Sequence, residues 1–184
     1  MASLEIARLG NPLLRQLAEP VDLNCLADPN SEIQTFIEDM VETMKVEGGV
    51  GLAAPQVSRS IQIVILEYED NERYPGHPEI PLTVLINPVI THYSEETAEG
   101  WESCLSLIDF RGLVPRSTKV VVEAYDRQGD QLHIEAEGFM AVVLQHEIDH
   151  LNGKVFIDRM TDMTKLSYLK EFDKYWAEEK VVDV

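Results

Sequence analysis

Apolar residues recur at helical spacing in the first quarter of the chain, and this periodicity predicts its first helix. Over residues 31–47 the apolar positions fall at i, i+3, i+4 and i+7, so one face of the helix packs on a core. Asn30 or Ser31 is suited to cap its start, and Gly48-Gly49 to end it. We therefore expect an amphipathic helix near the N-terminus, followed by a stretch of small residues.

A different pattern, of short apolar and β-branched runs, predicts a sheet in the middle of the chain. Residues 61–66 and 83–86 are typical of buried strands, and the polar residues 67–81 between them indicate a surface loop. Residues 118–125 and 131–137 flank a polar turn and predict a hairpin. Hairpins and short loops join antiparallel neighbours, so we expect sheets that are mainly antiparallel.

The last quarter of the chain begins with a helix that is apolar on every side. It is predicted over residues 138–151 and should end at Asn152. Because a helix of this kind is buried, we expect an α+β fold: antiparallel or mixed β-sheets around a central buried helix, with one N-terminal and one C-terminal helix. Residues 154–160 indicate a strand-like exit, and residues 166–176 an amphipathic C-terminal helix. The length of 184 residues favours a single domain over residues 1–184.

Composition and charge narrow the classes of function. The chain is 45% hydrophobic, as in globular proteins, and its formal net charge of −18 disfavours binding to nucleic acid or to anionic lipid. Its apolar runs are too short to span a bilayer, and the N-terminus has no signal or transit pattern. Cys25 and Cys104 allow at most one disulfide, which fits a reducing compartment. We therefore expect a cytoplasmic protein.

The central helix contains residues that could bind a metal. His146 and His150 are four residues apart, so both imidazoles lie on one helical face, and Glu147 beside them could act on a metal-bound water. Two histidines at this spacing also occur on ordinary amphipathic helices, but burial and the intervening glutamate favour a metal. Three apolar residues on the histidine face should form the wall of an apolar pocket: Phe139, Val142 and Val143.

Two histidines need a third protein ligand, and two candidates precede the helix. Cys104 would supply a thiolate, and a carboxylate such as Glu102 would supply oxygen. A buried cysteine is also an ordinary small core residue, so the chemistry alone leaves the choice open. The small-residue stretch 48–56 lacks the lysine of a phosphate-binding loop; it is read as a connection whose backbone can approach another group closely.

Three separate stretches resemble the signature motifs of the peptide deformylase family. They are residues 49–56, 102–106 and 145–150, in the family's order and at plausible separations. Each motif alone is modest, but the set is specific, and weaker similarity covers the chain from about residue 5 to residue 160. One position departs from the pattern, because Ser103 stands where glycine is usual. We predict that Ser103 changes how peptides are accommodated and leaves the activity intact.

The resemblance implies a reaction and a set of residues. The enzyme would hydrolyse the formyl amide of N-formylmethionyl peptides and of nascent chains at the ribosome. Hydroxide bound to one divalent metal would attack the formyl carbon, and formate would be released. The implied native metal is iron(II), and zinc, nickel or cobalt can replace it. The implied metal ligands are Cys104, His146 and His150. The implied catalytic residues are Glu147 as general base and acid, with Gln56 and Leu105 as oxyanion donors. The implied substrate-binding residues are Gly51, Ser103, Arg111, Phe139, Val142 and Val143.

Three other functions fit parts of the pattern. A zinc endopeptidase would leave Cys104 merely buried, and a thiol enzyme would use Cys104 as a nucleophile with a histidine base. A metal-dependent peptide-binding module would need no proton carrier at Glu147.

The acidic C-terminal region also argues against docking of the last helix on ribosomal RNA. The oligomeric state stays open.

Overall fold

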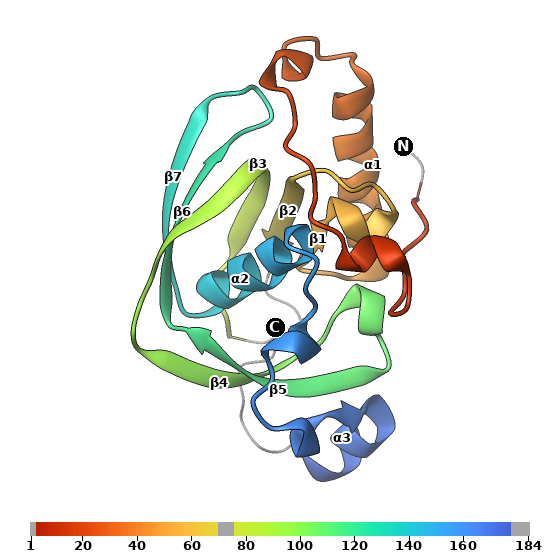
Figure 1. Ribbon diagram of the computed structural model, residues 1–184, viewed down its shortest axis with the longest axis vertical. Coiled ribbons are helices and arrows are strands. Elements are labelled where there is room, and N and C mark those ends of the chain that lie inside the picture. Colours follow the sequence, from red (N-terminus) through yellow and green to blue (C-terminus); the bar gives the residue numbers. More distant parts are fainter. Residues whose placement is uncertain (1–2, 70–75, 178–184) are drawn as a thin grey trace.

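The computed structural model describes residues 3–69 and 76–177, which form two antiparallel sheets and three α-helices (Figure 1). The helices are α1 (Glu32–Glu47), α2 (Phe139–Leu151) and α3 (Leu169–Tyr175). The strands are β1 (Gly51–Ala53), β2 (Ile63–Tyr68), β3 (Ile80–Tyr93), β4 (Thr97–Glu102), β5 (Phe110–Ser117), β6 (Lys119–Tyr125), β7 (Gln131–Glu137) and β8 (Ser167–Tyr168). The α+β class predicted from the sequence is confirmed.

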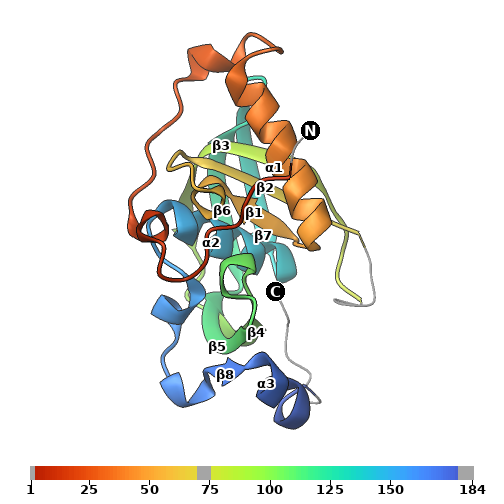
Figure 2. The ribbon, with the colours of Figure 1, turned by 90° about the vertical axis from the view of Figure 1, so that its right-hand side faces the viewer.

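The larger sheet has the strand order β1-β2-β3-β6-β7 and lies between α1 and α2 (Figures 1 and 2). Strand β2 shows why its sequence is apolar throughout. Ile63 and Ile65 belong to the core on the α1 side, and Val64 and Leu66 to the core on the α2 side. Side chains alternate along a strand, so a strand buried on both faces needs apolar residues at every position.

Helix α1 begins and ends as its sequence predicts. The Ser31 side chain accepts a hydrogen bond from the Gln34 amide, and Gly48 ends the helix in the left-handed conformation at φ 67°. The small residues that follow include β1, which pairs with β2 through Gly51 and Leu66. The sequence pattern did not predict this strand, because only Gly51–Ala53 form it and small residues have little strand preference.

The smaller sheet, with the order β4-β5-β8, closes the other side of α2 (Figure 1). It was not predicted, because Gly100, Gly112 and Pro115 interrupt the apolar alternation of its strands. Trp101 of β4 is fully buried and meets Phe172 of α3 edge to face, with ring centroids 4.9 Å apart. Through this contact the predicted C-terminal helix packs on the smaller sheet. Helix α3 is shorter than the predicted range 166–176.

Two further predictions about the chain's course differ in outcome. The hairpin is confirmed as β6 and β7, joined across the turn 126–130. The strand-like exit after α2 is wrong, because Phe156–Arg159 form a 3-10 helix in which the Asp158 carboxylate accepts a hydrogen bond from the Val155 amide at 2.8 Å. Of the predicted loop 67–81, residues 70–75 lie outside the described part. No helix in the described residues has the length and apolarity of a membrane span.

Candidate metal centre

Helix α2 presents His146, Glu147 and His150 toward one buried region. The helix packs against both sheets, and none of these three side chains is more than 5% exposed. The two imidazole rings lie 5.1 Å apart between centroids, one helical turn from each other. Burial of two imidazoles needs compensating partners, so their surroundings show what the region can bind.

Cys104 completes a group of three candidate ligands. It follows β4 and precedes the 3-10 helix Leu105–Leu107, and its Sγ lies 3.4 Å from His150 Nε2. One ligand atom from each of Cys104, His146 and His150 lies within 4.8 Å of the others. One sulfur and two imidazole nitrogens fit a tetrahedral transition-metal site, and three protein ligands leave a position for water or substrate. The donor set therefore suits a single divalent metal.

Glu102, the other candidate third ligand, lies behind His146. Its Oε2 is 2.8 Å from His146 Nδ1, and its Oε1 accepts a hydrogen bond from Arg116 Nε at 2.7 Å. A carboxylate in this place holds the imidazole with Nδ1 protonated and leaves Nε2 for the metal. Burial would raise the pKa of Glu102, but the Arg116 charge and the hydrogen bonds lower it, so the carboxylate stays ionised.

Glu147 is buried, and no described residue forms an ion pair with it. It lines the cavity beside the three ligands, and its Oε2 has no hydrogen-bond partner among the described residues. Burial raises the pKa of Glu147 to about 7, although the nearby His146 charge opposes the rise. The backbone of β1 approaches closely here, since a Cβ added at Gly51 would lie 2.5 Å from Glu147 Oε1. Only glycine at position 51 leaves room for this carboxylate.

Gln56 and Leu105 reach the cavity from two short 3-10 helices. The Gln56 side chain is oriented by the Ala53 amide, which donates to Oε1 at 2.8 Å, so Nε2 faces Cys104 Sγ at 3.5 Å. The N-terminal segment holds both helices from behind through three contacts. These are Ala7 N to Gln56 O at 2.7 Å, Leu9 N to Ser106 O at 3.0 Å, and the Arg8 guanidinium to Leu105 O.

The predicted substrate residues fall into two groups. Gly51, Ser103, Arg111 and Val143 line the cavity beside the metal ligands. The other two, Phe139 and Val142, line a second cavity. That cavity also contains Gly100 and Val114, and one turn of α2 separates it from His146. Phe139, Val142 and Val143 were predicted to form the wall of one pocket, but on this face of α2 they line two different cavities.

Three arginines near the site were given no role from the sequence. Arg8 holds Leu105, while Arg116 and Arg159 both bind Asp149. An isolated arginine carries no sign of burial in its sequence context. The available signal was Asp149, because a charged residue in a helix that is apolar all round requires a cationic partner.

Among the described residues, one buried Cys-His-His group could hold a metal ion, and with the carboxylate beside it on an α+β scaffold it has the donor set of a metallohydrolase. The family model described as polypeptide deformylase matches residues 3–166. The chain therefore belongs to the peptide deformylase family, and its activity is the hydrolytic removal of an N-formyl group.

Similar proteins agree with this assignment. Peptide deformylase 1 of Bordetella pertussis is 45% identical over 163 residues, covering 89% of this chain and 90% of that protein. Peptide deformylase 2 of Pseudomonas putida is 44% identical, with coverage of 89% and 91%. Among solved structures, a class I type b peptide deformylase of Acinetobacter baumannii, bound to Met-Ala-Ser, has a TM-score of 0.81 at 40% identity and covers 86% of this chain and 99% of its own. An actinonin complex of the Synechococcus elongatus enzyme has a TM-score of 0.77 at 33% identity, with coverage of 95% and 86%.

Proposed function

We propose that this chain removes the formyl group from the N-formylmethionyl end of nascent polypeptides in the cytoplasm, with residues 1–184 acting as one catalytic domain. The observation that carries the proposal is the convergence of Cys104, His146 and His150 within 4.8 Å, with Glu147 on the same cavity. The similar Acinetobacter enzyme was solved with the peptide Met-Ala-Ser, which has the form of a deformylated product.

Cys104, His146 and His150 would hold iron(II) as the native metal. When bound, the metal would polarise the formyl carbonyl and lower the pKa of water in the open position. Zinc, nickel and cobalt fit the same sulfur and nitrogen donors, so a purified sample can contain any of them. Glu102 contributes by holding His146, since its carboxylate lies 2.8 Å from Nδ1.

Glu147 would carry the proton between the two halves of the reaction. As a carboxylate it takes a proton from the attacking water while the new carbon–oxygen bond forms. It then gives that proton to the peptide nitrogen as the carbon–nitrogen bond breaks, which releases formate and a free amine. A pKa near 7 suits a group that must both accept and return a proton, and Oε2 is available because it has no partner among the described residues.

Gln56 and Leu105 would stabilise the negative charge that develops on the formyl oxygen. The Gln56 Nε2 and the Leu105 amide are donors fixed before the substrate arrives, because Ala53 and Arg8 hold them from behind. Donors fixed in this way cost no reorganisation when the charge develops.

The substrate peptide would lie along β1 and place its methionine against α2. Within the described sheet β1 is an edge strand, so the Gly51 backbone can pair with an extended peptide. Val143, with Phe139 and Val142 further along α2, would receive the methionine side chain. Ser103 and Arg111 line the same cavity as Gly51 and would contact the peptide, so a Ser103→Gly variant should change peptide preference.

The test is formate release from formyl-Met-Ala by anaerobically purified protein loaded in turn with iron(II), nickel and cobalt. Acetyl-Met-Ala serves as the control substrate, because the added methyl crowds the carbon that is attacked. We expect release from the formyl peptide only, one metal per chain, and loss of that metal in a Cys104→Ala variant. Metal retention by Cys104→Ala with cleavage of internal peptide bonds would instead favour an endopeptidase. Absence of formate with all three metals would refute the proposal.

A further inference from the structure

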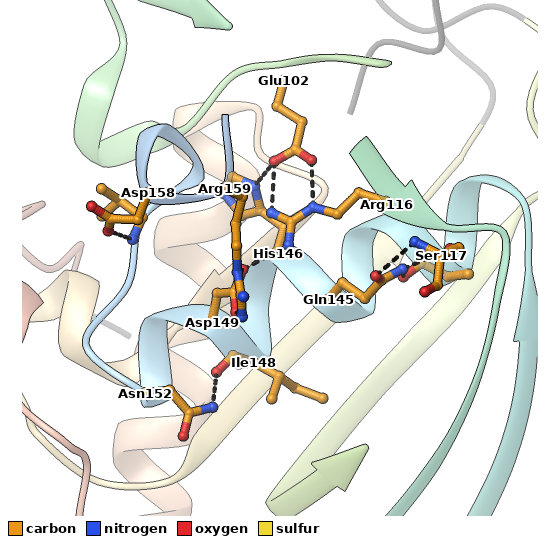
Figure 3. A network of polar contacts seen from close by, with 12 residues as sticks. Glu102, Arg116, Ser117, Gln145, His146, Ile148, Asp149, Asn152, Asp158 and Arg159 are labelled. Carbon is orange, nitrogen blue, oxygen red and sulfur yellow. Dashed lines mark hydrogen bonds and ion pairs between the residues drawn. The ribbon is translucent and has the colours of Figure 1, made fainter. Parts of the chain in front are cut away.

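A continuous chain of polar contacts runs from the metal ligand His146 to the protein surface (Figure 3). We call it the arginine relay. It consists of His146, Glu102, Arg116, Asp149 and Arg159. Arg116 donates from Nε to Glu102 Oε1 at 2.7 Å and from NH1 to Asp149 Oδ2 at 2.6 Å. Arg159 donates from Nε to the same Asp149 oxygen at 2.9 Å.

Charge alternates along the relay, and most of it is removed from water. Glu102 is 0% exposed, Arg116 5% and Asp149 6%, whereas the Arg159 side chain is 38% exposed. Two carboxylates and two guanidinium groups balance each other. Without Arg159, two buried carboxylates would share one guanidinium, and the uncompensated charge would lie close to a metal ligand.

The Arg116 guanidinium therefore donates to two carboxylates, Glu102 and Asp149. How strongly Asp149 draws on it depends on Arg159. The Arg116 guanidinium lies between Glu102 and Asp149, and it holds Glu102 with a two-pronged contact whose second hydrogen bond is 3.0 Å long. Arg159 also binds both oxygens of Asp149, so it satisfies a carboxylate that would otherwise draw on Arg116 alone. The geometry of Glu102 against His146 thus depends on a residue two ion pairs away.

We infer that Arg159 is a positioning residue for the metal centre: by holding Asp149 it keeps Arg116 on Glu102, and Glu102 on His146. Arg159 belongs to the 3-10 helix Phe156–Arg159 beyond α2 and touches neither the metal ligands nor the catalytic cavity. The inference rests on the proposed metal site, but not on the reaction performed there.

The chain supplies a matched control beside Arg159. Arg15 pairs with Asp158, the residue that precedes Arg159 in the same 3-10 helix, and the side chains of this pair are 42% and 34% exposed. Removal of Arg15 therefore also deletes a surface ion pair from that helix. It leaves the arginine relay untouched, because Asp158 makes no contact with Asp149, Arg116 or Glu102 in the described hydrogen bonds.

The experiment compares Arg159→Met, Arg159→Lys and Arg15→Met with the parent protein, each loaded with cobalt. Two quantities are measured: the rate of metal release to excess chelator, and the visible absorption bands of the cobalt–thiolate centre. We expect Arg159→Met to release cobalt about tenfold faster, within the range for residues that orient metal ligands, and to shift the cobalt bands. Arg159→Lys keeps the charge and should fall between Arg159→Met and the parent, and Arg15→Met should match the parent.

A purely structural role for Arg159 predicts a different result. The thermal unfolding midpoint would fall similarly in Arg159→Met and Arg15→Met, while metal release and the cobalt bands stayed at parental values or changed equally in both. Either result would overturn the inference. If Arg159→Met fails to fold, Arg159→Lys decides the matter, because parental release and bands in that variant contradict the need for a two-pronged guanidinium. Formate release by the parent protein is unaffected by any of these outcomes, so failure of the proposed function would be recognised separately.

Discussion

The two halves of the metal centre are built in different ways. The helix half consists of His146, Glu147 and His150, three side chains whose relative places follow from one regular helix. The turn half consists of Gln56, Cys104 and Leu105. Gln56 and Leu105 belong to two 3-10 helices almost fifty residues apart, and Cys104 directly precedes the second. The helix half has its geometry from local structure, whereas the turn half depends on tertiary contacts, above all those of the N-terminal segment.

Because of this difference, substitutions in the two halves should affect the site in different ways. A change in the helix half should remove one chemical role and leave the rest in place, because the helix persists. A change behind the turn half should displace donors without removing them, and its effect should be smaller. The variants below compare the two halves.

The largest effect is expected from the helix half, in Glu147→Gln. The amide keeps the shape of the side chain but cannot take a proton from water, so kcat should fall by about 10³-fold. The metal content should stay at the parental value, since Glu147 is not among the three clustered ligands. Formate release and metal analysis of the same sample test this. Parental activity in Glu147→Gln would remove Glu147 from the mechanism.

The same residue should also destabilise the metal-free protein as pH rises. The folded-state pKa of Glu147 is about 7, against an ordinary value of 4.5. Between these two values the unfolded chain has lost the proton and the folded chain keeps it, so stability falls as pH rises. Across this window the free energy of unfolding should decrease by about 3 kcal/mol through this group.

Urea unfolding of chelator-treated protein at about pH 4.5 and about pH 7.5 measures this loss. Other buried groups also titrate, so the informative quantity is the difference between the parent and Glu147→Gln. Exposed Glu95, changed to glutamine, is the control. A parent and a Glu147→Gln variant with parallel pH profiles would show that burial of this carboxylate costs no stability.

In the turn half, Gln56→Ala should lower kcat by about 10²-fold and leave KM nearly unchanged. As the proposed oxyanion donor, Gln56 would act on charge that develops only during the reaction, and removal of one such donor typically has an effect of this size. Gln34→Ala is a suitable control, because Gln34 is also buried and hydrogen-bonded but lies on α1. Equal losses in kcat and in substrate affinity would instead mean that Gln56 mainly binds the ground state.

The helix half was predictable from the sequence and the turn half only through resemblance. The i, i+4 spacing of His146 and His150 sets their common face in any α-helix, and the apolar surround indicates burial. Cys104 and Glu102 could not be distinguished as ligands, because only the tertiary structure places Glu102 behind His146. The structure also assigned contacts to Arg8, Arg116 and Arg159, whose partners are distant in sequence.

For the fold, too, the elements fixed by local sequence were predicted, and those that depend on tertiary contacts were not. Helix α1 and the β6–β7 hairpin have caps, turns and periodic patterns within a few residues, so they were predicted correctly. The strand-like exit after α2 failed because Phe156 is buried beside Gly112, where an added Cβ would lie 2.7 Å from its ring. Residues 154–160 alone contain no sign of that contact, and an apolar run in this position resembles a strand.

The smallest effect should come from Arg8, which supports the turn half from outside the cavity. The Arg8 guanidinium donates to the Leu105 carbonyl, and the Leu105 amide is the proposed oxyanion donor. In Arg8→Met the apolar stem remains, and the backbone contacts of Ala7 and Leu9 still hold the segment. The Leu105 amide should therefore be displaced slightly, and kcat should fall by about tenfold with KM little changed.

Arg59→Met serves as the control for Arg8→Met, because Arg59 is also partly exposed and ion-paired but contacts α1 through Glu32 and Phe36. A combined Arg8→Met and Gln56→Ala variant gives the decisive comparison. If both residues serve the same oxyanion position, the double variant should lose less than the product of the two single losses. Fully multiplicative losses would mean that Arg8 acts elsewhere, and that the turn half does not depend on the N-terminal segment as these contacts indicate.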